Sequence, residues 1–248
     1  MKILAPVSSV QEAKAHLKEG AQEFYCGLNP DVCYDSKEPG SWLNRREPGK
    51  ANLKSLAELK ELVAVAHEGG AKVFLALNQH SYDPQVYQDL LAMVERIESS
   101  CGVDAYIIAD PGLIRLLKEA FPDLVIHVSS LAAVLNSAAV SFFSQLGAKR
   151  IVFPRYIPLA TMEKIIKESG DHLEYEAFIL NDGCVFEEGY CFVSHGFGGA
   201  FCHNPDWRYK PIKVRERAPS ENITVKRRYF RKEKEDFQMH LDEYKRWL

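Results

Sequence analysis

The chain has 248 residues, of which 46% are hydrophobic and 26% are charged, and its formal net charge is −3. This composition is typical of a globular protein, and the net charge is too small to indicate a class of partner. No stretch approaches the roughly 18 consecutive apolar residues of a membrane span, and Pro6 cuts the apolar N-terminus too short for a signal peptide. We therefore expect a cytoplasmic protein without a membrane span.

Short apolar runs alternate with longer amphipathic stretches along most of the chain. The apolar runs are rich in Val, Ile, Phe and Tyr, which is typical of parallel strands that are buried on both faces. The predicted strands are Lys2–Val7, Glu23–Leu28, Lys72–Leu77, Ala105–Ala109, Leu124–Val128, Arg150–Pro154 and Glu174–Leu180. The predicted helices are Ser9–Glu19, Leu53–Glu68, Pro84–Ser99, Gly112–Ala120, Leu135–Leu146 and Leu159–Ser169. Three of them are closely followed by a glycine, as helix C-termini often are, at Gly20, Gly69 and Gly147.

This alternation predicts right-handed βαβ units and a parallel sheet. A Gly-Ala pair precedes three of the strands, and such loose repetition of one unit favours a TIM-like (β/α) barrel over an open doubly wound sheet. No glycine-rich phosphate loop follows the first strand, which argues against a dinucleotide-binding fold. Seven strands without a clear eighth unit predict an incomplete barrel. Its two sheet edges should be covered by the segment after Asp206 or by a partner subunit.

The last fifth of the chain differs in charge from the rest. Residues 207–248 hold 13 Lys and Arg against 7 Asp and Glu, whereas residues 1–206 hold 18 against 27. We predict a barrel domain over 1–206, with a cysteine-rich loop at 181–206, and a basic extension over 207–248 that ends in a helix at Arg231–Leu248. The basic and aromatic stretch Lys226–Lys232 can bind RNA through phosphates and base stacking, but a solvated helix and loop would show the same composition.

A cluster of cysteines follows the seventh predicted strand. It consists of Cys184, Cys191 and Cys202, with His195 and His203 nearby. Because the sites of (β/α) barrels are built where the strands end, we expect this cluster at the C-terminal mouth. Three thiolates in one place suit zinc or an iron–sulfur cluster. The alternative is three cysteines that are simply buried in a core.

A tetrahedral site needs a fourth ligand. Cys33 is the first candidate, because it lies in the long loop after the second strand and hence at the same mouth. His195 and His203 are the alternatives, and a histidine would suit zinc. We expect Cys26, inside a strand, and Cys101, at a helix end, to be structural.

Four further polar residues lie in or just after predicted strands: Asn78, His127, Arg155 and Glu176. Polar groups at such positions line the pocket of a barrel, so we predict a catalytic role for them. Arg155 can hold the carboxylate of a small substrate, and His127 can act as a general acid or base. Alternatively, His127 and Glu176 form buried hydrogen-bonded pairs that hold loops.

The segment from Glu176 to Ser194 resembles the signature of the collagenase-like peptidase family U32, which runs E-x-F-x-x-G-[SA]-[LIVM]-C-x4-G-x-C-x-[LIVM]-S. The spacing is kept throughout, although Asn181, Asp182 and Gly183 replace the usual Gly, small and aliphatic residues. Further stretches resemble the same family, namely Leu4-Ala-Pro6, Tyr25-Cys-Gly27, Leu77-Asn78, Asp104-Ala, Asp110-Pro-Gly-Leu, Ile126-His-Val-Ser129, Asn136, Arg150 and Pro154-Arg155. The resemblance covers roughly residues 1–202.

The resemblance implies an iron–sulfur protein of the oxygen-independent hydroxylation type, which acts on RNA or on a quinone precursor and holds a four-iron four-sulfur cluster on four cysteines. Such relatives carry two cysteines as C-x3-C after the signature. Here Cys202 matches the first and Asp206 replaces the second, so that Cys33 becomes the implied fourth ligand beside Cys184 and Cys191. Zinc is the alternative metal. A protein prepared in air can lack the cluster, because exposed thiolates oxidise.

Three functions therefore stay open. The first is a hydroxylation-type enzyme. The second is a peptidase with Cys184 or Cys191 as nucleophile and His195 nearby, although neither an H-E-x-x-H nor a G-x-S-x-G motif is present. The third is a non-catalytic subunit that pairs with a related partner or with itself, which the missing barrel unit suggests.

Overall fold

The computed structural model describes residues 1–29, 33, 43–46, 51–179, 209–211 and 230–232. The chain divides into two compact units, Met1–Gly198 and Gly199–Leu248. The predicted boundary after Asp206 lies outside the described residues and stays a prediction. In the second unit, β8 (Tyr209–Pro211) pairs antiparallel with β9 (Phe230–Lys232). The expected terminal helix therefore does not begin at Arg231, since the aromatic residues before it favour extended chain. The rest of that helix lies outside the described residues.

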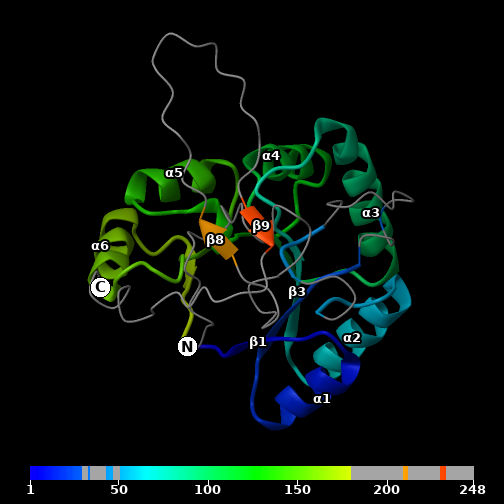
Figure 1. The fold of residues 1–248 in the computed structure, drawn as a ribbon. Coiled ribbons are helices and arrows are strands. Elements are labelled where there is room, and N and C mark those ends of the chain that lie inside the picture. The colour runs from blue at the N-terminus through cyan, green and yellow to red at the C-terminus, as the bar shows by residue number, and fades with distance from the viewer. Residues whose placement is uncertain (30–32, 34–42, 47–50, 180–208, 212–229, 233–248) are drawn as a thin grey trace. The chain divides into compact units, whose positions relative to one another are not determined.

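The first unit contains one sheet of seven parallel strands, which pair in chain order. The strands are β1 (Leu4–Pro6), β2 (Glu23–Cys26), β3 (Lys72–Leu77), β4 (Ala105–Ile108), β5 (Ile126–Val128), β6 (Arg150–Val152) and β7 (Glu174–Glu176). The sheet curls into part of a barrel, and the helices lie along its outside (Figure 1). Within the described residues β1 and β7 each pair on one side only. The predicted incomplete TIM-like barrel is thus confirmed.

In the described part of the chain, six α-helices each follow a strand of the sheet, as the amphipathic stretches predicted. They are α1 (Val10–Lys18), α2 (Leu56–Glu68), α3 (Tyr87–Ser100), α4 (Pro111–Ala120), α5 (Ser137–Gln145) and α6 (Leu159–Ser169), and two short 3-10 turns, η2 (Pro84–Val86) and η3 (Ser130–Ala132), lie between them. The side chains of Ser9 and Ser55 each accept a hydrogen bond from the amide of a Glu three residues later. This capping box explains why α1 and α2 begin there.

The ends of the helices show why glycine recurs before the strands. Gly20, Gly70 and Gly147 have φ angles of 87°, 76° and 91°, in the left-handed region that only glycine adopts without strain. Gly69, the glycine predicted to end α2, keeps a helical φ of −80°, and the turn is made one residue later.

The sheet has two covered faces. Between the sheet and the helices lies a continuous apolar core, to which the strand residues Phe24, Leu75 and Ile108 contribute with no exposed surface. Inside the curl lies a second, smaller apolar group formed by Phe74, Ala105 and Ile107. Burial on both faces explains the unbroken apolar runs. Among the described residues no helix is long and apolar enough to cross a membrane.

Candidate functional site

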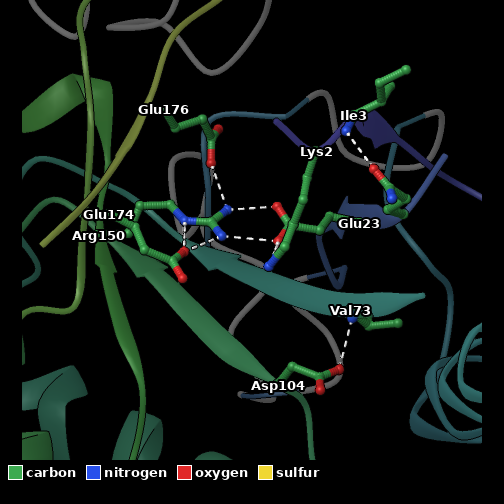
Figure 2. A network of polar contacts seen from close by, with 9 residues as sticks. Lys2, Ile3, Glu23, Val73, Asp104, Arg150, Glu174 and Glu176 are labelled. Atoms are coloured by element: carbon green, nitrogen blue, oxygen red, sulfur yellow. Dashed lines mark hydrogen bonds and ion pairs between the residues drawn. The ribbon is translucent and has the colours of Figure 1, made fainter. Parts of the chain in front are cut away.

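Arg150 is the centre of a polar network that closes one end of the curled sheet (Figure 2). It is the first residue of β6, and its side chain is 7% exposed. Its Nη1 and Nη2 atoms donate to the two carboxylate oxygens of Glu23, the first residue of β2, at 2.7 and 2.9 Å. Arg150 also donates to Glu174 through Nε at 2.8 Å and to Glu176 through Nη1 at 3.1 Å. Lys2 lies 3.2 Å from Glu23.

The charges of this network are largely balanced within it. Burial acts to raise the pKa of Glu23, but the hydrogen bonds and charges of Arg150 and Lys2 outweigh it and hold that pKa below its usual value. Burial raises the pKa of Glu176, and its bond to Arg150 offsets only part of this effect. Because Glu23, Arg150 and Glu174 each begin a strand, the network lies at the end opposite the barrel mouth, and we call it the barrel floor.

Glu176, which the sequence predicted as catalytic, joins the barrel floor through its bond to Arg150. It is the last residue of β7, and its side chain is 18% exposed. The geometry agrees with the alternative that Glu176 forms a buried hydrogen-bonded pair. Its partner is Arg150. A catalytic role for Glu176 stays a prediction.

His127 lies inside the curl of the sheet, in β5, and is 4% exposed. Its ring packs edge-on against Phe74, with the ring centroids 4.5 Å apart. Its Nδ1 atom is buried and has no hydrogen-bond partner among the described residues. Burial, and then the charge of Arg150, lower the pKa of His127 to about 3. The imidazole is therefore neutral near pH 7 and can accept or donate one hydrogen bond toward a bound substrate.

Asn78 follows β3 at the opposite end from the barrel floor, which is the mouth. Its side-chain amide donates to the Ser129 hydroxyl, which follows β5, at 3.3 Å. Its side-chain oxygen accepts from the backbone amide of Arg45 at 3.1 Å. Asn78 thus ties together two strand ends and a loop segment at the mouth, where it was predicted.

The segment Leu43–Arg46 is a part of the mouth that the sequence analysis missed. Leu43 and Asn44 are each 1% exposed, and the Tyr82 hydroxyl donates to the Leu43 carbonyl at 2.6 Å. A Cβ atom on Gly27 would lie 2.5 Å from Asn44 Nδ2, so only glycine leaves room for this segment at the end of β2. The glycine of the Tyr25-Cys-Gly27 stretch was the available signal.

Arg155 lies just after β6 and is exposed, with its guanidinium 5.3 Å from the centroid of the Phe178 ring. Phe178 follows β7 by two residues. Both side chains therefore lie at the mouth end of the last two strands, as predicted for Arg155. Its proposed carboxylate-binding role stays a prediction.

The cysteines are described only in part. Cys184, Cys191, Cys202, His195 and His203 lie outside the described residues. No group of three or more His, Cys, Asp or Glu side chains that could hold a metal occurs among the residues that the structure describes. The four-cysteine site and its alternative histidine ligands therefore stay predictions.

Cys33 is half-buried and packs against the apolar core. Burial, and then the charge of Asp89 on α3, raise the pKa of the Cys33 thiol to about 12. A metal ligand must be a thiolate, which these surroundings disfavour, so the described residues alone do not make a fit for a cluster. Cys26 is fully buried and Cys101 directly follows α3, in agreement with their expected structural roles.

Residues 8–243, which include β2 to β7 and the mouth residues described above but not β1, match Peptidase family U32. The chain belongs to peptidase family U32. This confirms the resemblance seen in the signature around Cys184 and in the shorter stretches at the strand ends.

Two relatives and one solved structure show what the chain is similar to. The tRNA hydroxylation protein P of Helicobacter pylori (strain J99) is 30% identical over 196 residues, which are 78% of this chain and 42% of that protein. The 23S rRNA 5-hydroxycytidine C2501 synthase of Escherichia coli is 26% identical over 206 residues, which are 83% of this chain and 28% of that enzyme. The structure of the U32 peptidase Mk0906 has a TM-score of 0.52 at 22% identity and covers 71% of this chain and 68% of that one. This U32 chain spans less than half the length of these two curated relatives.

Proposed function

We propose that this U32 chain is the barrel part of an RNA hydroxylation protein, which acts in the cytoplasm and adds an oxygen atom to a base of tRNA or rRNA. One observation carries the proposal. The relatives named as tRNA hydroxylation proteins and as an rRNA hydroxycytidine synthase align with about four fifths of this chain. The aligned part is long enough to include most of the βα units that form the mouth.

The described side chains support this proposal by their placement. The barrel floor is closed by Arg150, whose charge is shared among three carboxylates. The mouth instead presents hydrogen-bonding groups at strand ends, including Asn78 and Ser129. A neutral His127 lies between the two ends, and its Nδ1 atom has no hydrogen-bond partner in the described part of the chain. These groups can orient a base and accept or hold a proton, while Arg155 can hold an anionic group of a substrate.

The proposed cofactor is a four-iron four-sulfur cluster on Cys33, Cys184, Cys191 and Cys202. When bound, such a cluster supplies one-electron transfer or a Lewis-acidic iron. The support is the family signature around Cys184 and Cys191, together with the soft ligand set that the thiols of Cys33 and Cys202 would complete. Zinc, with His195 or His203 in place of Cys33, is the competing assignment.

Anaerobic purification of the full chain tests the cofactor. We expect about four irons per chain and a brown protein, and we expect Cys184→Ser to lose both. Cys101→Ser is the matched control, because Cys101 is a half-buried cysteine outside the proposed set, and it should keep the iron. A colourless, iron-free chain under these conditions would refute the iron–sulfur cluster. One zinc ion per chain would establish the zinc site instead.

Nucleoside mass spectrometry tests the reaction. RNA from a host that lacks the gene should lack a nucleoside one oxygen heavier than its parent, and the wild-type chain or its full-length relative should restore it. His127→Phe keeps the ring packing on Phe74 but removes both ring nitrogens, so we expect it to restore little of the product. Unchanged RNA in the gene-deficient host would contradict the proposal.

The family name supports a second candidate, a peptidase that uses Cys184 or Cys191 as nucleophile with His195. It predicts cleavage of denatured collagen that a thiol-blocking reagent stops, and the absence of cleavage removes it. A role as a non-catalytic subunit predicts that a related partner, or a second copy, co-purifies in stoichiometric amount from the native host.

A further inference from the structure

Two arginines lie over aromatic rings on the inner side of the barrel, one at each end. At the floor, the Arg150 guanidinium carbon is 5.0 Å from the centroid of Phe74. Toward the mouth, the Arg46 guanidinium carbon is 4.8 Å from the centroid of Tyr25. The two arginines differ in the groups that surround their positive charge.

Arg150 has three carboxylate partners, whereas Arg46 has none among the described residues. Arg46 Nε donates to the Ala51 carbonyl at 2.7 Å, and its Nη2 donates to the Val7 carbonyl at 3.1 Å. Within the described part of the chain no carboxylate forms an ion pair with Arg46, and its Nη1 atom makes no hydrogen bond. A partly buried charge without a counter-ion is unfavourable, and an anionic ligand would relieve that cost.

The backbone around Arg46 is held firmly in place. Its amide donates to Asn44 Oδ1 at 2.8 Å. Asn44 in turn donates to the Leu28 carbonyl at 3.3 Å, and its own carbonyl accepts from Gln79 at 3.1 Å. These bonds connect the segment to the loops that follow β2 and β3. The guanidinium is therefore preorganised, and little conformational entropy is lost when it binds a ligand.

Among the described residues, basic and acidic side chains are distributed differently between the mouth and the floor of the barrel. Among the described segments that follow strands, the basic residues are Arg45, Arg46, Lys54 and Arg155, and the acidic ones are Asp83 and Asp110. Asp110 is 4% exposed and accepts bonds from the Gly112 amide and the Tyr87 hydroxyl, so its charge is already stabilised. The carboxylates of Glu23, Glu174 and Glu176 gather at the floor instead. Among these described segments, positive charge is therefore in excess at the mouth end.

We propose that Arg46 binds a phosphate group of the RNA substrate at the barrel mouth, through its Nη1 edge, while Tyr25 and two backbone carbonyls hold the rest of the guanidinium. This inference rests on the proposed function, since it assigns the contact to the RNA of that reaction. A guanidinium suits the task because its fixed donors match the oxygens of a phosphate and its charge persists at any physiological pH.

Fluorescence anisotropy with labelled tRNA tests the assignment. We expect Arg46→Gln to weaken binding by about tenfold and to reduce the slope of log K against log salt by about one, as loss of one phosphate contact does. Arg115→Gln is the matched control, because Arg115 is an exposed arginine on α4 that pairs with Glu119. It removes the same charge and should leave both quantities unchanged. An Arg46→Gln chain that binds like the control overturns the proposal.

Arg46 also connects Val7 to Ala51, so its replacement can unfold the mouth. A measurement on the wild-type chain avoids this problem. Phenylglyoxal modifies accessible arginines, and peptide mass spectrometry reports each site. We expect saturating tRNA to slow modification of Arg46 at least several-fold more than that of Arg115, and equal protection of both overturns the assignment. If the wild-type chain fails to bind tRNA at any salt concentration, the proposed function fails. If it binds and Arg46 is unprotected, only this inference fails.

Discussion

Replacement of Arg150 by methionine would test whether the barrel floor depends on its ion pairs. Methionine keeps an unbranched side chain that reaches about as far as Nε of the arginine, but it removes the guanidinium and its charge. Glu23, which is 3% exposed, would lose two hydrogen bonds of 2.7 and 2.9 Å and keep only Lys2 as a cationic neighbour. Removing one partner of a buried ion pair leaves an uncompensated charge, which costs about 3–5 kcal/mol.

The three carboxylates do not contribute equally to that cost. Glu174 is 59% exposed, so its pairing with Arg150 is screened by water and adds little. Glu176 is 18% exposed, and its pKa is already raised, so it can take up a proton when Arg150 is absent. The unpaired charge of Glu23 therefore accounts for most of the cost. We expect Arg150→Met to lower the free energy of unfolding by about 3–4 kcal/mol at pH 7.

The stability difference between the wild-type chain and Arg150→Met should depend on pH. In the wild-type chain the pKa of Glu23 lies below its unfolded value, so its contribution to stability is present at neutral pH and is lost as the pH falls through the folded pKa. Without Arg150, burial raises the pKa of Glu23, and protonation near pH 4 removes the uncompensated charge. The difference in stability between wild type and variant should therefore shrink from pH 7 to pH 4.

Urea unfolding followed by circular dichroism at both pH values measures this difference. The double variant Arg150→Met/Glu23→Leu should recover most of the loss, because an apolar pair of similar volume replaces the ion pair. A loss below about 1 kcal/mol at pH 7, or a loss that does not shrink toward pH 4, would refute the view that Arg150 compensates buried carboxylates.

Three further outcomes follow from single side chains. The pKa of His127 falls from 6.5 to about 3 on folding, so the neutral ring favours the folded chain above pH 6.5 and this stability is lost on acidification. His127→Phe should remove about 2 kcal/mol of the loss between pH 7 and pH 5, and an unchanged pH profile in urea unfolding would contradict this. Gly27→Ala should destabilise by about 1–3 kcal/mol, because its Cβ would meet Asn52 Oδ1 at 2.2 Å. Gly69→Ala, which meets only the flexible end of Leu17, should cost less than about 0.5 kcal/mol in the same assay, and equal losses would argue against the crowding. Asp110→Ala should cost about 2–3 kcal/mol, since four donors lose their acceptor. It should also lower the pKa of Tyr87, which burial and Asp110 raise to about 12. An ultraviolet titration of the tyrosines that does not change would count against that contact.

The candidate site was predictable where it depended on strand ends. Asn78 follows an apolar run and therefore had to lie at the mouth of a parallel sheet. The same reasoning put Cys33 at the mouth, because it comes after the second strand. Its side chain packs against the apolar core, near enough to Asp89 of α3 to be affected by its charge, and its place in a metal site stays a prediction. Order along the chain places a loop but does not orient its side chains.

Other parts of the site had no local signal. Arg150 and Glu23 are 127 residues apart, and each looks like an ordinary first residue of a strand. Arg46 lies in a long segment without periodicity, and its contact with Tyr25 depends on the absence of a side chain at Gly27. Such contacts arise only when the sheet curls and brings separate strands to face one another.

The sequence by itself determined the order of strands and helices and the family. These features depend on hydrogen bonds and burial patterns that span only a few neighbouring residues, so they can be read locally. Only the tertiary structure decided which inward side chains meet: a floor where Arg150 binds three carboxylates, and a mouth where Arg46 has no carboxylate partner among the described residues. The physical reason is that electrostatic energy depends on distance in space, and the curl of the sheet sets that distance.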